Sequence, residues 1–329
     1  MNGLETSKER VRKALAGRKQ AQVPFIPWVC THAARLEQVS VQRMLSDPSL
    51  LARAVQSSQK LYGYDVVINI FDPALEAEAC GCPVRWTGEK ELPSVEGHPP
   101  IDRMSEDAIA SIQTKGRLPV VIEATRRLKI NLGRTVAMAG VVTGPWTVAN
   151  HLNGRDILQD LESRPERSRD IVDLAGKICI EVCKAYGEIE LDVIVLADSV
   201  LSRIPPANSS LTLSVLNPLL NVIRFYDSIP LLLTTGCSQE SLDLLAEVDV
   251  EALVADGPIG PEFKQKMPHC IVGRALPGTV LQGPEEDLAV YLKGLLADGQ
   301  GQFISTEWQV PYDTPPANMH RVMKSIRGA

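Results

Sequence analysis

Three carboxylates stand within seven residues in the run Phe71-Asp-Pro-Ala-Leu-Glu-Ala-Glu-Ala-Cys-Gly-Cys82, directly after an apolar segment. Carboxyl groups crowded in a cleft can hold raised pKa values for proton transfer, bind a cation or orient the N–H groups of a ligand. Asp72 precedes a proline that fixes the local chain, so its carboxylate is expected to point into a cleft. Glu76 and Glu78 could serve the same site or lie on one exposed helical turn.

Other polar residues follow other apolar segments and supply further types of chemistry. Imidazole and carboxylate groups can transfer protons or bind metal ions, while hydroxyl, guanidinium and indole groups can contact a substrate. Trp146 could instead be packed in the core with Thr147 capping the next helix, and Cys237 could be an inert small residue rather than a thiolate ligand. The candidates of this kind are His32, Arg35, Trp146, His151, Asp198, Ser199, Cys237, Arg274, Glu307 and Trp308.

Eight short apolar segments recur along the chain, each closed by polar or small residues and followed by a stretch with helical periodicity. This count predicts an α/β fold, a single (β/α)8 TIM barrel. Active sites in such barrels are built at the C-terminal ends of the strands, so we expect Asp72, His151, Asp198 and Cys237 to surround one opening. The predicted strands are Phe25–Val29, Asp65–Ile70, Val136–Gly144, Val193–Asp198, Leu231–Gly236, Ala252–Asp256, Ile271–Ala275 and Phe303–Glu307.

Two segments fall outside the eight repeating units. Residues 5–15 have the pattern of an amphipathic helix capped by Thr6 or Ser7, and this N-terminal extension is expected to pad the barrel floor. The stretch from Asp72 to about Pro100 has no sustained period and is too long for an ordinary βα loop, so we expect an insertion that shapes a pocket or an interface. Further helices are predicted at 118–130, 155–188, 208–226, 239–248, 260–267, 284–298 and 315–327, with Asp47-Pro48, Arg164-Pro165 and Gly283-Pro284 marking starts or breaks.

Composition and charge narrow the class of protein. The 329 residues are 44% hydrophobic and 22% charged, and we expect residues 1–329 to form one globular domain with a large core. A net charge of −6 argues against nucleic acid or an anionic membrane as a partner. No run reaches about 18 apolar residues and the N-terminus lacks an apolar signal segment, so a cytoplasmic location is expected. Seven cysteines, an odd number, indicate reduced thiols.

Five segments at or beside the strand ends carry a family resemblance. They are Tyr64–Asp72, Gly144–Gly154, Val193–Ser199, Ile271–Pro277 and Val310–Asn318. Through them the chain resembles the uroporphyrinogen decarboxylase superfamily over nearly its whole length. That superfamily also contains corrinoid-linked methyltransferases that act on methanol, methylamine-derived or O-methyl substrates.

The pattern of the decarboxylase itself is half present. The resemblance places Asp72 on the carboxylate that holds the pyrrole N–H groups, Ser199 on a substrate-contacting serine and Arg35 on the second arginine of an arginine motif. Thr31 replaces the first arginine of that motif, and His151 replaces a site tyrosine. Because a polycarboxylate substrate needs several fixed cations, the missing arginine weighs against decarboxylation.

The run from Glu76 to Cys82 instead resembles the Glu-Ala-Glu-Ala-Leu-Gly-Cys segment of the methyltransferase branch. Members of that branch typically hold zinc through a His-x-Cys pair after the fifth strand and a cysteine after the eighth, where this chain has Thr234, Gly236 and Trp308. A catalytic zinc site needs three protein ligands and an open position. Zinc would therefore need a different ligand set, drawn from Cys30, His32, Glu76, Glu78, Cys237 and Glu307.

The favoured interpretation is the methyltransferase component of a corrinoid-dependent system. The barrel would bind a small O- or N-methyl compound and present its methyl group to a partner protein that carries cobalamin. Because the corrinoid supplies the nucleophile, the barrel has to position the substrate and activate the leaving group, with Asp72, Glu76 and His151 as catalytic residues. The alternatives are uroporphyrinogen decarboxylase and a non-catalytic barrel that binds a tetrapyrrole or corrinoid; the chain could also form a homodimer. Substrate contacts are assigned to Arg35, Trp146, Asp198, Ser199, Arg274 and Trp308.

Overall fold

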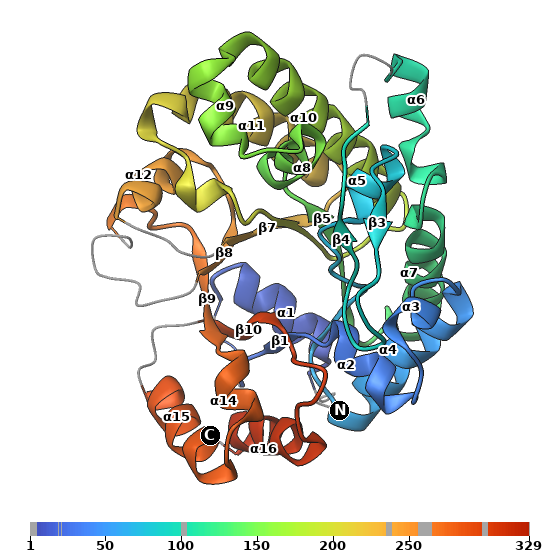
Figure 1. Cartoon of the computed structure of the whole chain (residues 1–329). Helices are drawn as coiled ribbons and strands as arrows, with labels where there is room; N and C mark the ends of the chain where they lie inside the picture. The colour runs from blue at the N-terminus through green and yellow to red at the C-terminus, as the bar shows by residue number, and fades with distance from the viewer. Residues whose placement is uncertain are drawn as a thin grey trace.

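Eight parallel strands form a sheet that curls into a ring (Figure 1). The computed structural model describes residues 5–18, 20, 22–99, 104–234, 239–255, 265–297 and 302–328. The strands follow the order β1-β10-β9-β8-β7-β6-β5-β2, and across the two ends of that order the Asp65 N–H donates to the Phe25 carbonyl oxygen at 3.0 Å. The ring is thus nearly closed, and the predicted TIM barrel is confirmed. The strands are β1 (Phe25–Trp28), β2 (Val66–Ile68), β5 (Ala137–Thr143), β6 (Val193–Ala197), β7 (Ile229–Thr234), β8 (Ala252–Ala255), β9 (Ile271–Leu276) and β10 (Phe303–Gln309).

The strands coincide with apolar segments because both of their faces are covered. Every residue of β5 and β6 is buried, as expected for parallel strands between a barrel interior and a layer of helices. Gly273 pairs with Phe303 across β9 and β10, and a Cβ at Gly273 would lie 2.1 Å from that phenyl ring. The barrel interior is therefore a packed core rather than a pore.

Helices surround the ring of strands (Figure 1). The predicted helix at 155–188 is two helices, because Arg164 departs from helical geometry and Pro165 begins the second one. The predicted helix at 260–267 lies mainly outside the described residues. The helices are α1 (Ser7–Leu15), α2 (Cys30–Leu36), α3 (Val41–Met44), α4 (Pro48–Tyr62), α5 (Leu75–Ala79), α6 (Glu106–Ala110), α7 (Leu118–Leu132), α8 (Pro145–Asn153), α9 (Ile157–Ser163), α10 (Pro165–Gly187), α11 (Ser209–Phe225), α12 (Gln239–Glu247), α14 (Gly278–Gln282), α15 (Glu285–Ala297) and α16 (Pro316–Arg327).

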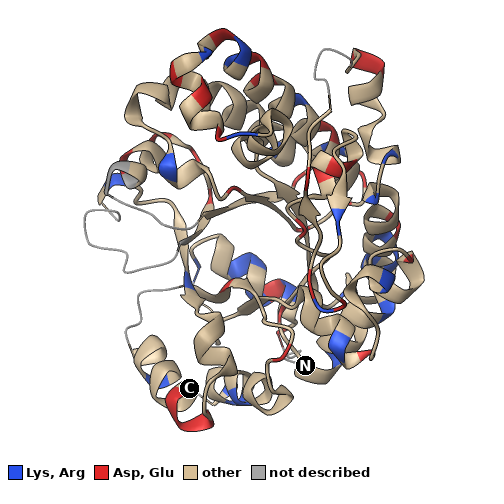
Figure 2. Ribbon diagram, in the orientation of Figure 1, with Lys and Arg blue, Asp and Glu red and all other residues tan. Residues whose placement is uncertain are grey.

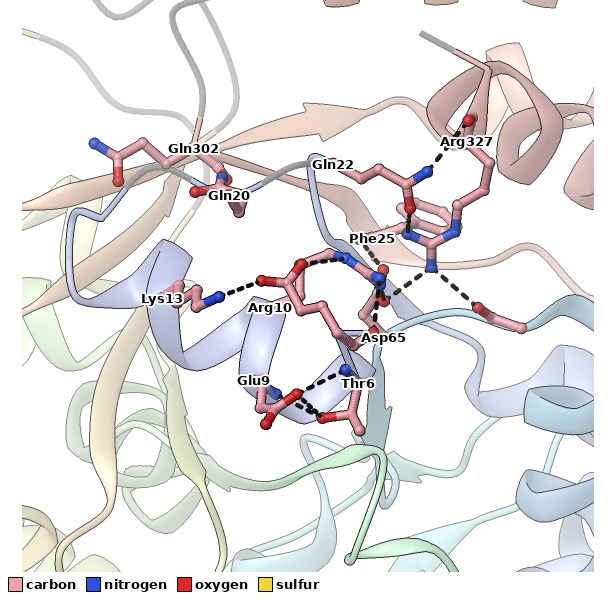
Figure 3. A network of polar contacts seen from close by, with 12 residues as sticks. Thr6, Glu9, Arg10, Lys13, Gln20, Gln22, Phe25, Asp65, Gln302 and Arg327 are labelled. Carbon is pink, nitrogen blue, oxygen red and sulfur yellow. Dashed lines mark hydrogen bonds and ion pairs between the residues drawn. The ribbon is translucent and has the colours of Figure 1, made fainter. Parts of the chain in front are cut away.

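The N-terminal helix α1 lies against the floor of the barrel, as expected from its pattern. A capping box fixes its first turn. Arg10 forms an ion pair with Asp65 at 2.5 Å, and Asp65 stands just before β2 (Figure 3). Arg12 reaches Asp192, just before β6, at 3.0 Å. These ion pairs hold α1 against the N-terminal ends of the strands, opposite the end where barrel enzymes carry their active sites.

The insertion after β2 contains more regular structure than its sequence indicated. It includes α5 and an antiparallel hairpin of two short strands, β3 (Val84–Arg85) and β4 (Ser94–Val95). Strands of two residues are too short to produce a periodic pattern, which is why no period was detectable. The chain then returns to the barrel through α6 and α7.

Charged residues are spread over the outer helices, and few of them lie in the strands of the barrel (Figure 2). Acidic and basic residues are interspersed on these helices, as is usual for a solvated surface. Within the part of the chain that the structure describes, no helix is both long and apolar enough to cross a membrane.

Candidate active site

Two side chains continue the pairing between β2 and β5 beyond the end of β2. The side-chain oxygen of Asn69 accepts from the Val141 N–H at 3.2 Å, and Glu76 Oε1 accepts from the Thr143 N–H at 3.0 Å. Both amides belong to β5, whereas β2 ends at Ile68. Glu76 is therefore held at the C-terminal ends of the strands, where a barrel carries its active site.

Glu76 is a buried residue, and only one of its two carboxyl oxygens accepts a hydrogen bond. The residue is 1% exposed, and its Oε2 has no hydrogen-bond partner. Burial raises the pKa of Glu76 to about 7; the hydrogen bond from Thr143 opposes this rise, and the charge of Asp72 adds to it. A carboxyl group of this kind can exchange a proton near neutral pH.

Asp72 is fully buried and pairs with an arginine that the sequence analysis did not identify. Its Oδ2 lies 2.5 Å from Arg117 Nη1, and its Oδ1 accepts from the Ala74 N–H at 3.0 Å. Burial raises the pKa of the Asp72 carboxyl, and the Arg117 charge opposes this rise. The Nε of the same guanidinium lies 2.6 Å from Glu78 Oε2. One cation therefore joins two of the three predicted carboxylates.

Arg117 reaches these carboxylates because the chain just before α7 packs closely on α5. Gly116 has a φ of +53°, and a Cβ there would lie 3.1 Å from the Ala79 nitrogen. This approach needs glycine both for its conformation and for its size. The Arg117 guanidinium also lies over the Trp86 ring, 5.1 Å from the ring centroid. Arg117 and Asp72 are 45 residues apart, so sequence spacing offers no signal for the pair.

Asp198 caps the N-terminus of α8 from the end of β6. Its Oδ2 accepts from the Trp146 N–H at 2.9 Å. Its Oδ1 accepts from the Thr147 N–H at 3.1 Å, the Thr147 hydroxyl at 2.8 Å and the Val200 N–H at 3.1 Å. Asp198 is fully buried, while the next residue, Ser199, is exposed. Substrate contact by Asp198 and Ser199 stays a prediction, and only the second of them reaches solvent.

Three aromatic side chains from separate elements contact one another at this end of the barrel. Phe71, which follows β2, stacks on Trp308 of β10 with ring centroids 5.3 Å apart. Trp28 of β1 meets Phe71 in a T-shaped contact at 5.7 Å. Trp308 is half-buried, whereas Trp146 is completely buried and its indole nitrogen has no partner. Substrate contact through either Trp146 or Trp308 stays a prediction.

His32 and Arg35, both on α2, are engaged in contacts with other parts of the chain. The ring nitrogens of His32 lie 2.8 Å from the Tyr62 hydroxyl and 3.1 Å from the Tyr312 carbonyl oxygen. Burial lowers the pKa of His32. Arg35 Nη1 donates to the Thr314 carbonyl oxygen at 2.5 Å. To bind a metal ion, His32 would have to lose its contact with Tyr62 or Tyr312. To bind a substrate through Nη1, Arg35 would have to lose its hydrogen bond to Thr314.

His151, near the end of α8, lines a cavity between this helix and the segment that follows β4. The cavity has a volume of about 400 Å³, and its lining includes His98 after β4 but neither Asp72 nor Glu76. The His98 ring packs against Gly154. Burial lowers the pKa of His151. Asp72 and Glu76 are both buried and do not line this cavity, while Arg117 joins Asp72 to Glu78. The expectation that Asp72, His151, Asp198 and Cys237 surround one opening stays a prediction.

Arg274 and Glu307 lie on β9 and β10, and both are half-buried. Burial raises the pKa of Tyr291 on the outer helix α15; the Arg274 charge opposes this rise and the Glu307 charge adds to it. Both residues are therefore within electrostatic range of an outer helix. Their contact with a substrate or a metal ion stays a prediction. Cys237 lies outside the described residues.

The donor set of the described residues does not fit a catalytic zinc ion. These residues contain no group of three His, Cys, Asp or Glu side chains that could hold a metal ion. Thr234 is buried with its hydroxyl unpartnered, and Trp308 is stacked on Phe71. Glu78 is occupied by Arg117. The described residues therefore provide no set of three zinc ligands.

Comparison with known proteins identifies the family. The family model described as Uroporphyrinogen decarboxylase (URO-D) matches residues 6–329. The chain belongs to the uroporphyrinogen decarboxylase family. The resemblance inferred from the five segments is thereby confirmed.

Within the uroporphyrinogen decarboxylase family, the chain is similar to proteins that carry methyltransferase names. Two proteins named methylcobamide:CoM methyltransferase MtbA, from Methanosarcina acetivorans and Methanosarcina mazei, are 24% and 25% identical to it, with 98% of this chain and 98% of each relative covered. A solved structure described as a methyltransferase from Methanosarcina mazei has a TM-score of 0.85 at 23% identity and covers 99% of both chains. The fold is the same, and the relatives agree with the expected methyltransferase branch.

Proposed function

We propose that this protein is a corrinoid-linked methyltransferase that moves a methyl group from a small O- or N-methyl compound to a partner protein carrying cobalamin. The observation that carries the proposal is the buried Glu76 carboxyl, with an unpartnered oxygen, beside the ion-paired Asp72 at the C-terminal ends of the strands. The methyltransferase names of the relatives support the reaction class.

The residues of the chain provide leaving-group activation and positioning. A reduced corrinoid on the partner supplies the nucleophile that takes the methyl group. The bond between the methyl carbon and the substrate oxygen or nitrogen breaks, and its electron pair stays on the substrate atom. Glu76 gives its proton to that atom and is left as a carboxylate. Asp72, paired with Arg117, fixes the end of β2 beside Glu76. His151 is the second candidate for proton transfer.

Methyl transfer from a methylcobamide to a thiol is the second candidate, because the names of the relatives describe transfer to CoM. Thr234 and Trp308 weigh against it, since the resemblance places zinc ligands at these positions in the methyltransferase branch. Neither a threonine hydroxyl nor an indole is a usual zinc ligand. We therefore favour an O- or N-methyl donor.

The other two alternatives fit the contacts less well. Uroporphyrinogen decarboxylation would need Asp72 to hold pyrrole N–H groups and Arg35 to pair with carboxylates. Asp72 is instead paired with Arg117, and Arg35 donates to the Thr314 carbonyl oxygen. A non-catalytic barrel that only binds a tetrapyrrole or corrinoid would have no use for a buried proton donor.

A donor panel tests the proposal. Purified protein is mixed with cob(I)alamin and, one at a time, methanol, methyl ethers and methylamines, and formation of methylcobalamin is followed by absorbance. Repeated turnover with at least one donor is expected. Parallel mixtures contain methylcobalamin with thiols, and uroporphyrinogen alone. Turnover only in one of these parallel mixtures, or binding of cobalamin without turnover, would replace the proposal with the corresponding alternative.

A further inference from the structure

Arg117 contacts three parts of the molecule through one guanidinium group. Its Nη1 lies 2.5 Å from Asp72 Oδ2, just after β2, and its Nε lies 2.6 Å from Glu78 Oε2 in α5. Its Cζ lies over the ring of Trp86, which directly follows β3, at 5.1 Å from the ring centroid. One side chain thus links the end of a barrel strand, the short helix of the insertion and the hairpin.

We infer that Arg117 is a positioning residue for the proposed reaction: it holds the Asp72 carboxylate and α5, and with α5 the Glu76 side chain, in the geometry that methyl transfer needs. The inference rests on the proposed function and adds a residue to it. Arg117 acts through Asp72 and Glu78 and needs no contact with the substrate.

Burial makes this arrangement depend on Arg117. The side chain of Asp72 is 0% exposed and that of Arg117 is 11% exposed. Without Arg117, the Asp72 carboxylate would keep one hydrogen bond, from the Ala74 N–H, and would become a buried charge without a counter-ion. The carboxyl group would then have to take up a proton or move toward solvent, and the end of β2 would move with it.

The geometry requires arginine rather than a cation in general. A planar guanidinium can donate to two carboxylates through different nitrogens while its face packs on an aromatic ring, whereas a lysine ammonium is a point charge. Arg117 Nη2 is buried without a partner. The contacts with Asp72, Glu78 and Trp86 therefore set the orientation of the guanidinium, although this orientation leaves one of its nitrogens without a hydrogen bond.

Arg85, on the hairpin that Arg117 contacts through Trp86, provides a matched control. Its Nε lies 2.6 Å from Glu96 Oε1 on the hairpin, and the two side chains are 62% and 44% exposed. Removing this pair takes one arginine from the insertion without uncovering a buried charge. Exposed pairs of this type contribute little to stability.

Kinetics of Arg117→Met, Arg117→Lys, Asp72→Asn, the double variant Arg117→Met/Asp72→Asn and Arg85→Met test the inference. Arg117→Met is expected to lower kcat about 10²-fold while KM changes less than about threefold, and Arg117→Lys is expected to recover part of the loss. Arg85→Met should keep the wild-type values. Since Arg117 acts partly through Asp72, the double variant should lose clearly less than the product of the two single losses. Losses that multiply, or an unchanged kcat in Arg117→Met, would overturn the inference.

Hydrogen exchange gives a readout that does not depend on activity. Arg117→Met is expected to speed amide exchange in residues 74–80 at least about tenfold, and Arg85→Met should leave these amides unchanged. Wild-type protein that transfers no methyl group would remove the proposed function alone. Unchanged exchange of residues 74–80 in Arg117→Met would overturn this inference whatever the activity.

Discussion

Thr147 donates both its backbone N–H and its hydroxyl to one oxygen of Asp198, at 3.1 and 2.8 Å. The contact ties the first turn of α8 to the end of β6, and the Trp146 N–H occupies the other oxygen at 2.9 Å. A carboxylate in this place satisfies the unpaired amides of the helix and is favoured by the helix dipole. This side of the barrel mouth is therefore built on a buried carboxyl cap.

Asp198→Asn is expected to lower the free energy of unfolding by about 2–4 kcal/mol. An asparagine presents an NH₂ group to some of the four donors that face Asp198, so these donors lose their acceptor. Urea denaturation measures the loss. Ser199→Ala, at the exposed neighbouring residue, is the control and should change the stability by less than about 0.5 kcal/mol. Equal stability of the two variants would contradict the capping role.

Gly144→Ala is expected to destabilise the protein, because a Cβ there would lie 2.3 Å from the Asp198 Cβ. Overpacking of a filled site costs about 1–3 kcal/mol. At Gly294 in α15, nothing lies within 4 Å of an added Cβ. Gly294→Ala should therefore be neutral or stabilise α15 by up to about 1 kcal/mol. Thermal unfolding compares the two, and a loss at Gly294 as large as at Gly144 would be inconsistent with this packing.

The rate of methyl transfer is expected to fall as the pH rises through about 7. The protonated form of Glu76 is the proposed acid, and burial raises its pKa to about 7. Glu76→Gln should lower kcat about 10²–10⁴-fold and remove this pH dependence. His151→Gln is the matched comparison, because it removes the second candidate donor and should leave the pH limb in place. If His151→Gln lost the fall in rate above about pH 7 while Glu76→Gln kept the wild-type rate and pH dependence, the general acid would be His151 and not Glu76.

Stability should also depend on Glu76, with a definite sign. The folded protein binds this proton more tightly than the unfolded chain, because the pKa rises from 4.5 to about 7 on folding. The contribution of Glu76 to stability therefore falls as the pH rises from about 4.5 to about 7. Glu76→Gln cannot ionise, so its stability relative to wild type should increase over this interval. Urea denaturation at about pH 5 and pH 8 measures the change, and a constant difference would argue against a buried acid.

Asp65→Asn should reduce stability while kcat stays unchanged. Asp65 is buried at the barrel floor and pairs with Arg10 at 2.5 Å and Arg327 at 2.9 Å (Figure 3). Breaking a buried ion pair costs about 3–5 kcal/mol, and this one lies at the end opposite the candidate site. Lys13→Ala removes the exposed partner of the Lys13–Glu5 ion pair at the N-terminal helix and should be nearly neutral. A lower kcat in folded Asp65→Asn protein would show that the two ends of the barrel are coupled.

The barrel could be predicted because each strand is an apolar segment closed by polar residues. The predicted strand Val193–Asp198 differs from β6 by one residue, and of the two expected caps, Thr6 and Ser7, it is Thr6 that caps α1. In both places the residues that produce the sequence pattern also make the structural contact: the apolar residues of β6 are buried, and the Thr6 side chain accepts a hydrogen bond from the Glu9 N–H. The hairpin of the insertion was missed because strands as short as Val84–Arg85 carry no period.

The contacts of the candidate site could not be predicted, because they join residues that are distant in the sequence. Asp72 follows β2 by four residues, and its partner Arg117 lies 45 residues further along the chain without a motif. The partners of Asp198 are mostly backbone amides, and because every residue type except proline has such an amide, the sequence gives no sign of these contacts. His151 lies near the C-terminal end of α8 and lines a cavity whose lining includes neither Asp72 nor Glu76, and its role in the site stays a prediction.

The central claim is that the barrel moves a methyl group from an O- or N-methyl donor to cobalamin and uses Glu76 as the acid. Its most direct test is NMR detection of carbon-13 methylcobalamin after wild-type protein and Glu76→Gln are each given labelled donors and cob(I)alamin. Wild-type protein should transfer the label from at least one donor, and Glu76→Gln of equal thermal stability should do so about 10²-fold more slowly. Absence of label with every donor, or equal rates for the two proteins, would contradict the account.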